Sequence, residues 1–86
     1  MNANITEITV QLPTEVSYWG DEATKSDVTR ILDNFEAMIK NEFRTATLEI
    51  RFERTPTPRG NGVHGDNEEA CQDIFEWMQN NWVMAL

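Results

Sequence analysis

Two segments of the chain alternate strictly between apolar and polar side chains, and this alternation limits the possible folds most. Residues 5–12, ITEITVQL, place Ile8, Val10 and Leu12 on one side, and residues 46–54, ATLEIRFER, repeat the pattern. Successive side chains of a strand point to opposite faces of a sheet, so the pattern predicts two strands, each with one polar face. A strand covered on both faces would be apolar throughout. We therefore expect helices on only one face of the sheet.

Two further segments have the three- and four-residue spacing of amphipathic helices. Thr24 and Asp27 form a capping pair at the start of the first helix, predicted over residues 25–43. Asp66 and Glu69 mark the start of the second helix. The predicted buried positions are Val28, Ile31, Leu32, Phe35, Ile39 and Phe43 in the first helix, and Cys71, Ile74, Phe75, Met78, Trp82 and Ala85 in the second.

Two segments between these elements are harder to interpret. TEVSYWG, residues 14–20, is rich in strand-forming residues, and we expect it to fold back as a short hairpin partner after Pro13. Residues 55–65 combine two Thr-Pro steps with three glycines, which predicts an irregular loop. The 86 residues are enough for one small domain. The prediction is a single α+β domain spanning residues 1–86, a two-layer sandwich with a two- to three-stranded sheet, two helices on one face, and the order β-(β)-α-β-α.

Gly60, Gly62 and Gly65 have the G-x-G-x-x-G spacing of dinucleotide-binding loops. In such loops a pyrophosphate lies at the amino end of the following helix, where the helix dipole supplies positive partial charge. Here the first helical turn reads DNEE, residues 66–69, and those carboxylates would repel an anion. We expect no cofactor. The loop is either a plain connection or a segment that reaches a partner.

Catalytic chemistry has few candidate residues. Cys71 and His64 are the single cysteine and the single histidine, but Cys71 lies on an apolar helical stripe, where burial raises the pKa of a thiol. The acids after His64 do not converge, because positions 66, 69 and 73 share a helix face and position 68 does not. We expect no catalytic residue and no metal site. A small enzyme or ligand binder that uses the 55–65 loop is therefore a less favoured hypothesis than the two given at the end of this section.

The charge of the chain is strongly negative and unevenly distributed. Fifteen acidic and seven basic residues give a net charge of −8, and every Lys and Arg lies within residues 25–59. Such a surface repels nucleic acid and anionic membranes and attracts a basic protein. The first residues do not resemble a secretion signal, and we expect a cytoplasmic protein.

Two groups of acids lie next to aromatic residues and are the predicted partner-binding residues. The first is a helical stripe of Glu69, Asp73 and Glu76 with Trp77 beside it, and the second is Asp21 and Glu22 beside Trp19. Carboxylates pair with arginine, and indole rings stack on the guanidinium group. The simpler interpretation is a hydrated acidic helix face, with Trp77 packing the edge of the helix against the sheet.

The leading hypothesis is a non-enzymatic module that binds an Arg/Lys-rich surface of a nucleic-acid-binding protein, as a monomer or homodimer. By analogy of size and charge alone, the chain resembles inhibitors encoded by viruses or mobile elements, including anti-CRISPR proteins that occupy basic nucleic-acid channels. The alternative is an assembly protein that self-associates through the exposed sheet face, where Glu49, Arg51 and Glu53 alternate in sign.

Overall fold

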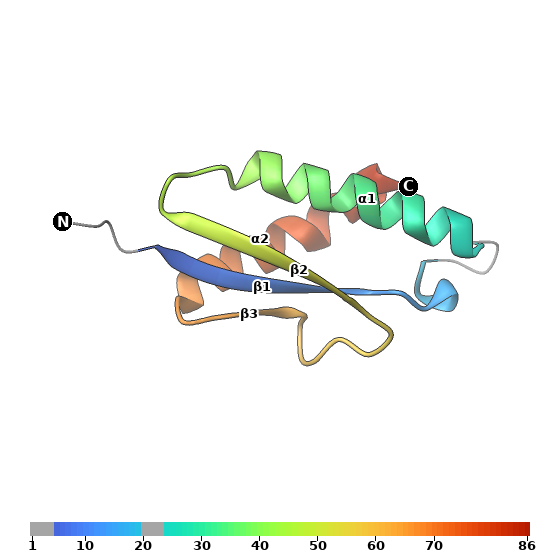
Figure 1. Cartoon of the computed structure of the whole chain (residues 1–86), viewed down its shortest axis with the longest axis horizontal. Helices are drawn as coiled ribbons and strands as arrows, with labels where there is room; N and C mark the ends of the chain where they lie inside the picture. The colour runs from blue at the N-terminus through green and yellow to red at the C-terminus, as the bar shows by residue number, and fades with distance from the viewer. Residues whose placement is uncertain (1–4, 20–23) are drawn as a thin grey trace.

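Three strands and two helices form most of residues 5–19 and 24–86, the part of the chain that this computed structural model describes (Figure 1). Both alternating segments are strands and both periodic segments are helices, as the sequence predicts. In chain order the elements are β1 (Thr6–Pro13), the 3₁₀ helix η1 (Val16–Tyr18), α1 (Lys25–Glu42), β2 (Leu48–Thr55), β3 (Val63–Gly65), α2 (Glu68–Asn81) and the 3₁₀ helix η2 (Trp82–Ala85).

The sheet is mixed and has β1 at its centre. Its strand order is β2-β1-β3, with β2 parallel and β3 antiparallel to β1. Because parallel neighbours cannot be joined by a tight turn, α1 provides the crossover between β1 and β2. Ile8, Val10 and Leu12 of β1 are at most 1% exposed and lie in the core.

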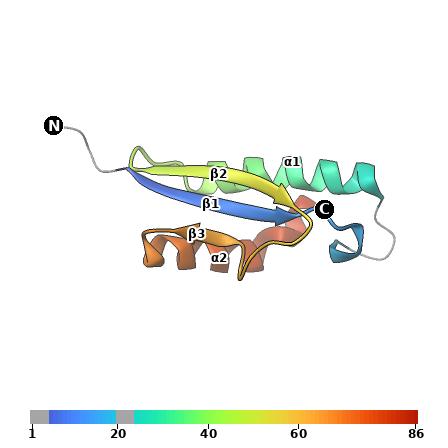
Figure 2. The ribbon, with the colours of Figure 1, turned by 60° about the horizontal axis from the view of Figure 1, so that its bottom comes forward.

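Both helices cover the same face of the sheet, which confirms the predicted two-layer arrangement. Figure 2 shows α1 behind β2 and α2 behind β3, with the opposite face of the sheet open. Polar residues of all three strands lie on that open face, as the alternation requires. Among the described residues, no helix is both long and apolar enough to cross a bilayer.

The start of α1 is fixed by the predicted capping pair. The backbone N–H of Asp27 donates to Thr24 Oγ1 at 3.2 Å, and the backbone N–H of Thr24 donates to Asp27 Oδ2 at 2.9 Å. The hydrogen bonds from the backbone and hydroxyl of Thr24, together with the nearby charge of Arg30, lower the pKa of Asp27. The capping box therefore depends on an ionised carboxylate.

We expect Asp27→Asn to be less stable than the natural protein at neutral pH, because a neutral amide accepts these hydrogen bonds less well. The folded pKa of Asp27 lies below its unfolded value, so its contribution is fully present above the unfolded value and lost as pH falls through the folded pKa. Urea unfolding at several pH values should show the two proteins converging in acid. Glu42→Gln, at the exposed end of the same helix, is the control; a deficit that persists in strong acid contradicts the expectation.

The predicted hairpin strand over residues 14–20 is wrong. Residues 16–18 form η1 instead, and β2 and β3 occupy the two edges of β1 where a hairpin partner would pair. The backbone N–H of Thr14 donates to the carbonyl oxygen of Thr55 at 3.1 Å, which continues the pairing with β2. Local strand propensity is overridden here by tertiary pairing.

The 55–65 loop is also more regular than the sequence predicts, because its last residues form β3. Gly62 allows this strand to approach β1: its carbonyl oxygen accepts from the backbone N–H of Gln11 at 2.6 Å, and its φ is +83°. His64 lies in this strand opposite Thr9 rather than in an open loop. Gly62 therefore allows a close contact between the backbones of β3 and β1.

Candidate partner-binding surface

The exposed face of α2 carries the predicted acidic stripe. Asn67 caps this helix, with its side chain accepting from the backbone N–H of Ala70 at 3.0 Å. Glu69, Asp73 and Glu76 are all exposed, at helical spacings that place them on one face. The structure therefore brings together the three carboxylates that the sequence predicts.

The carboxylates of this region have no cationic partner within the described part of the chain. The five acids of residues 66–76 form no ion pair with a Lys or Arg among residues 5–19 and 24–86. The only side-chain hydrogen bond to the stripe within that part of the chain comes from Gln72 Nε2 to Glu76 Oε1, at 3.1 Å. This face therefore keeps its negative charge.

The ion pairs of the described residues lie instead on α1 and the sheet. Arg54 donates to Asp33 at 2.6 Å and to Glu36 at 2.8 Å, and these two hydrogen bonds raise the pKa of the arginine. Arg51 pairs with Glu7 at 3.1 Å and with Glu49 at 3.7 Å. Acids and bases thus neutralise each other around α1 and β2, while α2 presents acids alone.

Trp77 lies at the edge of the core rather than on the acidic face. Its ring stacks on Phe35 at a centroid distance of 6.4 Å and meets Phe43 edge-on at 5.8 Å. The indole is half-buried against α1. Most of this side chain therefore stabilises the packing of α2 against α1, whereas the simpler interpretation of the sequence placed it against the sheet.

Trp19 is not exposed, contrary to the sequence-based expectation. Only 7% of the residue is accessible, and its indole Nε1 donates to the carbonyl oxygen of Pro13 at 2.8 Å. Its neighbour Tyr18 is the exposed aromatic, at 64%. The 3₁₀ turn of η1 determines which of these two aromatic side chains points into the core. Asp21 and Glu22, the acids predicted beside Trp19, lie outside the described residues.

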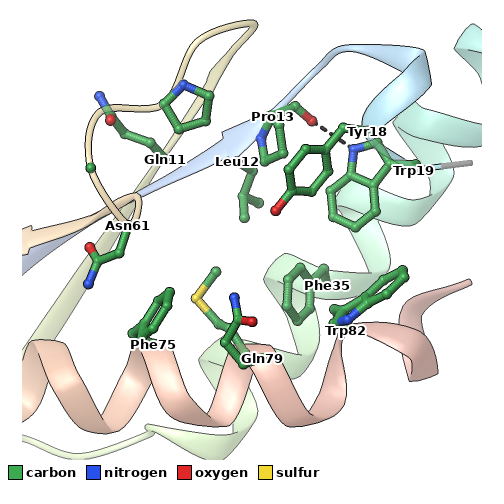
Figure 3. A pocket seen from close by; sticks show the side chains of 13 residues that line it. Gln11, Leu12, Pro13, Tyr18, Trp19, Phe35, Asn61, Phe75, Gln79 and Trp82 are labelled. Atoms are coloured by element: carbon green, nitrogen blue, oxygen red, sulfur yellow. Dashed lines mark hydrogen bonds between the residues drawn. The ribbon is translucent and has the colours of Figure 1, made fainter.

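A cavity of about 370 Å³ between η1, the 58–61 loop and α2 was not predicted from the sequence. Figure 3 shows Tyr18 and Trp19 on one side of it, with Phe75, Gln79 and Trp82 on the opposite side. The sequence predicts a buried Trp82, but 36% of this residue is exposed, because α2 ends at Asn81 and the chain continues as the 3₁₀ turn of η2. Segments distant in sequence build this cavity, and no local pattern marks it.

The cavity is lined mainly by apolar and aromatic side chains, together with the amides of Gln11, Asn61 and Gln79. Its described lining contains no carboxylate, imidazole, thiol or amine that could act as an acid, base or nucleophile. The Tyr18 hydroxyl and the Gln79 amide have no hydrogen-bond partner among the described residues, so both remain free to bind a polar group of a ligand. Gln79 lies one helical turn after Glu76, which places the cavity beside the acidic stripe.

The thiol of Cys71 is not activated. Burial raises its pKa, and the charges of Asp66 and Glu68 raise it further. His64 and Cys71 line one shallow hollow, but the imidazole Nε2 contacts the carbonyl oxygen of Arg59 at 2.9 Å. A thiol protonated at neutral pH is a poor nucleophile.

Comparison of the chain with protein-family models, curated proteins and solved structures gave no match.

Proposed function

We propose that this chain is a non-enzymatic protein-binding module that applies the acidic face of α2 to an Arg/Lys-rich protein surface. The single observation that carries this proposal is the absence of an internal cationic partner for the five acids of residues 66–76 among the described residues. Like charges held close together destabilise a fold through mutual repulsion. A cationic partner surface removes that repulsion when it binds.

The partner that fits best is a protein whose basic surface binds nucleic acid. A row of carboxylates at helical spacing offers arginine side chains charge-assisted, bidentate hydrogen bonds in place of phosphates. Nucleic acid and this chain then compete for the same surface. This is the mode of action of nucleic-acid mimics, and the analogy with inhibitors from viruses or mobile elements belongs to the same proposal.

The aromatic cavity supplies an apolar anchor next to the charged face. Interfaces gain most of their affinity from a few buried apolar or aromatic contacts, while surrounding charges mainly set specificity and association rate. If an apolar side chain of the partner enters the cavity between Tyr18 and Trp82, a neighbouring basic residue of the partner can pair with Glu76. The two features together suit a partner with apolar and cationic residues side by side.

The experiment is affinity capture from the source cells with the natural chain and two charge-matched variants. Glu69→Lys with Glu76→Lys reverses the acidic face; Glu15→Lys with Glu42→Lys makes the same charge change away from it. A basic protein retained by the natural chain and the control, released by salt and by added nucleic acid, is the expected result. Equal retention by all three chains, or no basic protein retained by the natural chain, contradicts the proposal.

A small-ligand site is the second candidate, and the cavity volume favours it. Ligand sites commonly measure roughly 300–1,000 Å³ and are mainly apolar with a few polar groups. Pro58, Gly60 and Asn61 of the 55–65 loop line this cavity, as a loop-based ligand binder requires. Such a ligand would bind independently of Glu69 and Glu76, so the same two variants distinguish the two functions.

A further inference from the structure

β2 leaves a long and regular edge of the sheet without a paired strand among the described residues. It is eight residues long and lies at the end of the order β2-β1-β3. The carbonyl oxygens of Thr47 and Thr55 accept from the backbone N–H groups of Thr6 and Thr14, so these odd-numbered positions point towards β1. Backbone groups alternate in direction along a strand. The N–H and C=O groups of Leu48, Ile50 and Phe52 therefore point outward.

This edge has few of the features that prevent pairing. β2 pairs with β1 in continuous register from Leu48 to Thr55, without a bulge, and the first proline follows at position 56. Natural sheets block exposed edges with bulges, prolines, short strands or charges directed inward. Of these features β2 has one, the inward-directed Arg54 near its end, which binds Asp33 and Glu36 of α1. β3, at the opposite edge, is only three residues long. The β2 edge is the one that can accept another strand.

The side chains of β2 also differ in burial from those of β1 on the same sheet face. Leu48, Ile50 and Phe52 are only half-buried under α1, whereas the three apolar residues of β1 are fully buried. On the other face, Arg51 is 65% exposed and Glu49 is 51% exposed, although Arg51 also pairs with Glu49 at 3.7 Å and with Glu7 at 3.1 Å within the chain. The edge therefore combines accessible apolar groups on one face with accessible charges of both signs on the other.

We propose that the β2 strands of two copies of this chain pair antiparallel about a two-fold axis at Ile50. In this register Leu48 lies opposite Phe52 of the second copy, and Ile50 lies opposite its counterpart. Glu49 lies opposite Arg51 of the second copy, twice by symmetry. Because the outward backbone groups belong to even-numbered residues, this arrangement also aligns donors with acceptors.

The neighbouring registers bring less compatible side chains together, so the axis at Ile50 is the preferred register. An axis at Arg51 places Arg51 against Arg51 and Glu49 against Glu53, so like charges meet directly. An axis at Phe52 places Ile50 opposite Arg54, which already binds Asp33 and Glu36. Only the axis at Ile50 matches apolar with apolar residues on one face and opposite charges on the other.

The resulting dimer has one six-stranded sheet. Both acidic faces remain free, because α2 covers the β3 side of the sheet (Figure 2). An interface limited to one strand and its side chains is small, so we expect a weak, concentration-dependent dimer. This inference does not depend on the proposed function, since it uses the β2 edge of the sheet, whereas the proposed binding face lies on α2 at the β3 side.

The test is sedimentation equilibrium of the full chain in buffer of about 0.15 M ionic strength, which screens the repulsion between the two copies. Glu49→Arg and Arg51→Glu should each raise the dimer Kd by at least about tenfold, since both replace attraction with repulsion across the axis. An equal mixture of the two variants should form a heterodimer, because one chain then carries arginine at positions 49 and 51 and the other carries glutamate at both. Circular dichroism confirms that each variant is folded.

The heterodimer is the decisive result, because no defect in the fold of either variant would produce it. Asp73→Lys, on α2, is the control and should leave the dimer unchanged. A natural chain that stays monomeric at millimolar concentration overturns the inference. A dimer that persists in both single variants, or a mixture that fails to associate, overturns it as well.

Discussion

Replacing Trp19 with alanine is expected to lower the free energy of unfolding by about 3–5 kcal/mol, the range for removing a large aromatic side chain from a core. Its indole lies within 6.4 Å of Phe35 and 6.0 Å of Trp82, centroid to centroid, and is only 7% exposed. Small domains have about 5–15 kcal/mol of total stability, so the alanine variant will be largely or wholly unfolded on warming. Thermal and urea unfolding measure the loss.

Two further variants keep this prediction informative. Trp19→Phe retains most of the packing but leaves the Pro13 carbonyl oxygen without its donor, which should cost about 1–3 kcal/mol. Tyr18→Ala, at the exposed neighbour, should cost less than about 1 kcal/mol, as exposed substitutions usually do. A Trp19→Ala protein as stable as the natural one would contradict the buried position of this indole and would support the exposed position expected from the sequence.

Gly62→Ala is expected to destabilise the fold by about 2–4 kcal/mol, from left-handed backbone strain plus a steric clash. The φ of +83° disfavours any residue with a side chain, and an added Cβ would lie 2.9 Å from the backbone oxygen of Gln11. Relief of that contact would separate β3 from β1. For a domain of this size the melting temperature should fall by roughly 10 °C or more.

Gly60→Ala is the matched control for this substitution. Its φ of +55° carries similar backbone strain, but the nearest atom to an added Cβ is a side-chain carbon of His64 at 3.8 Å. The difference between the two variants therefore isolates the contact with β1. Equal losses of stability would show that the close approach of Gly62 to Gln11 contributes little.

The sequence predicted those parts of the fold that follow from local periodicity. Alternation in residues 5–12 and 46–54 predicted both long strands and the coverage of a single sheet face, because each depends only on which side chains avoid water. Thr24 and Asp27 predicted the start of α1, since a capping box is made within four residues. These predictions are confirmed because the tertiary contacts favour the same strands and the same helix start as the local sequence.

The missed features depend on contacts between distant segments. β3 is three residues long, which is too short to show the apolar/polar alternation of a strand. It forms because Gly62 and Gly65 allow it to pair with β1. The exposure of Tyr18 rather than Trp19 follows from one 3₁₀ turn, whose phase the sequence does not specify. The cavity joins η1, the 58–61 loop and α2, so no single segment carries its signature. The acidic stripe was predictable because helical spacing alone defines it.

The most direct test of the central claim is the ionic-strength dependence of binding between this chain and its captured basic partner. The account predicts that association slows steeply with salt, and that Glu69→Lys with Glu76→Lys slows it about tenfold or more at low salt. The same account predicts a weaker salt dependence for that variant and no large change for Glu15→Lys with Glu42→Lys. A rate independent of salt, or equal in both double variants, would contradict the assignment of α2 as the binding face.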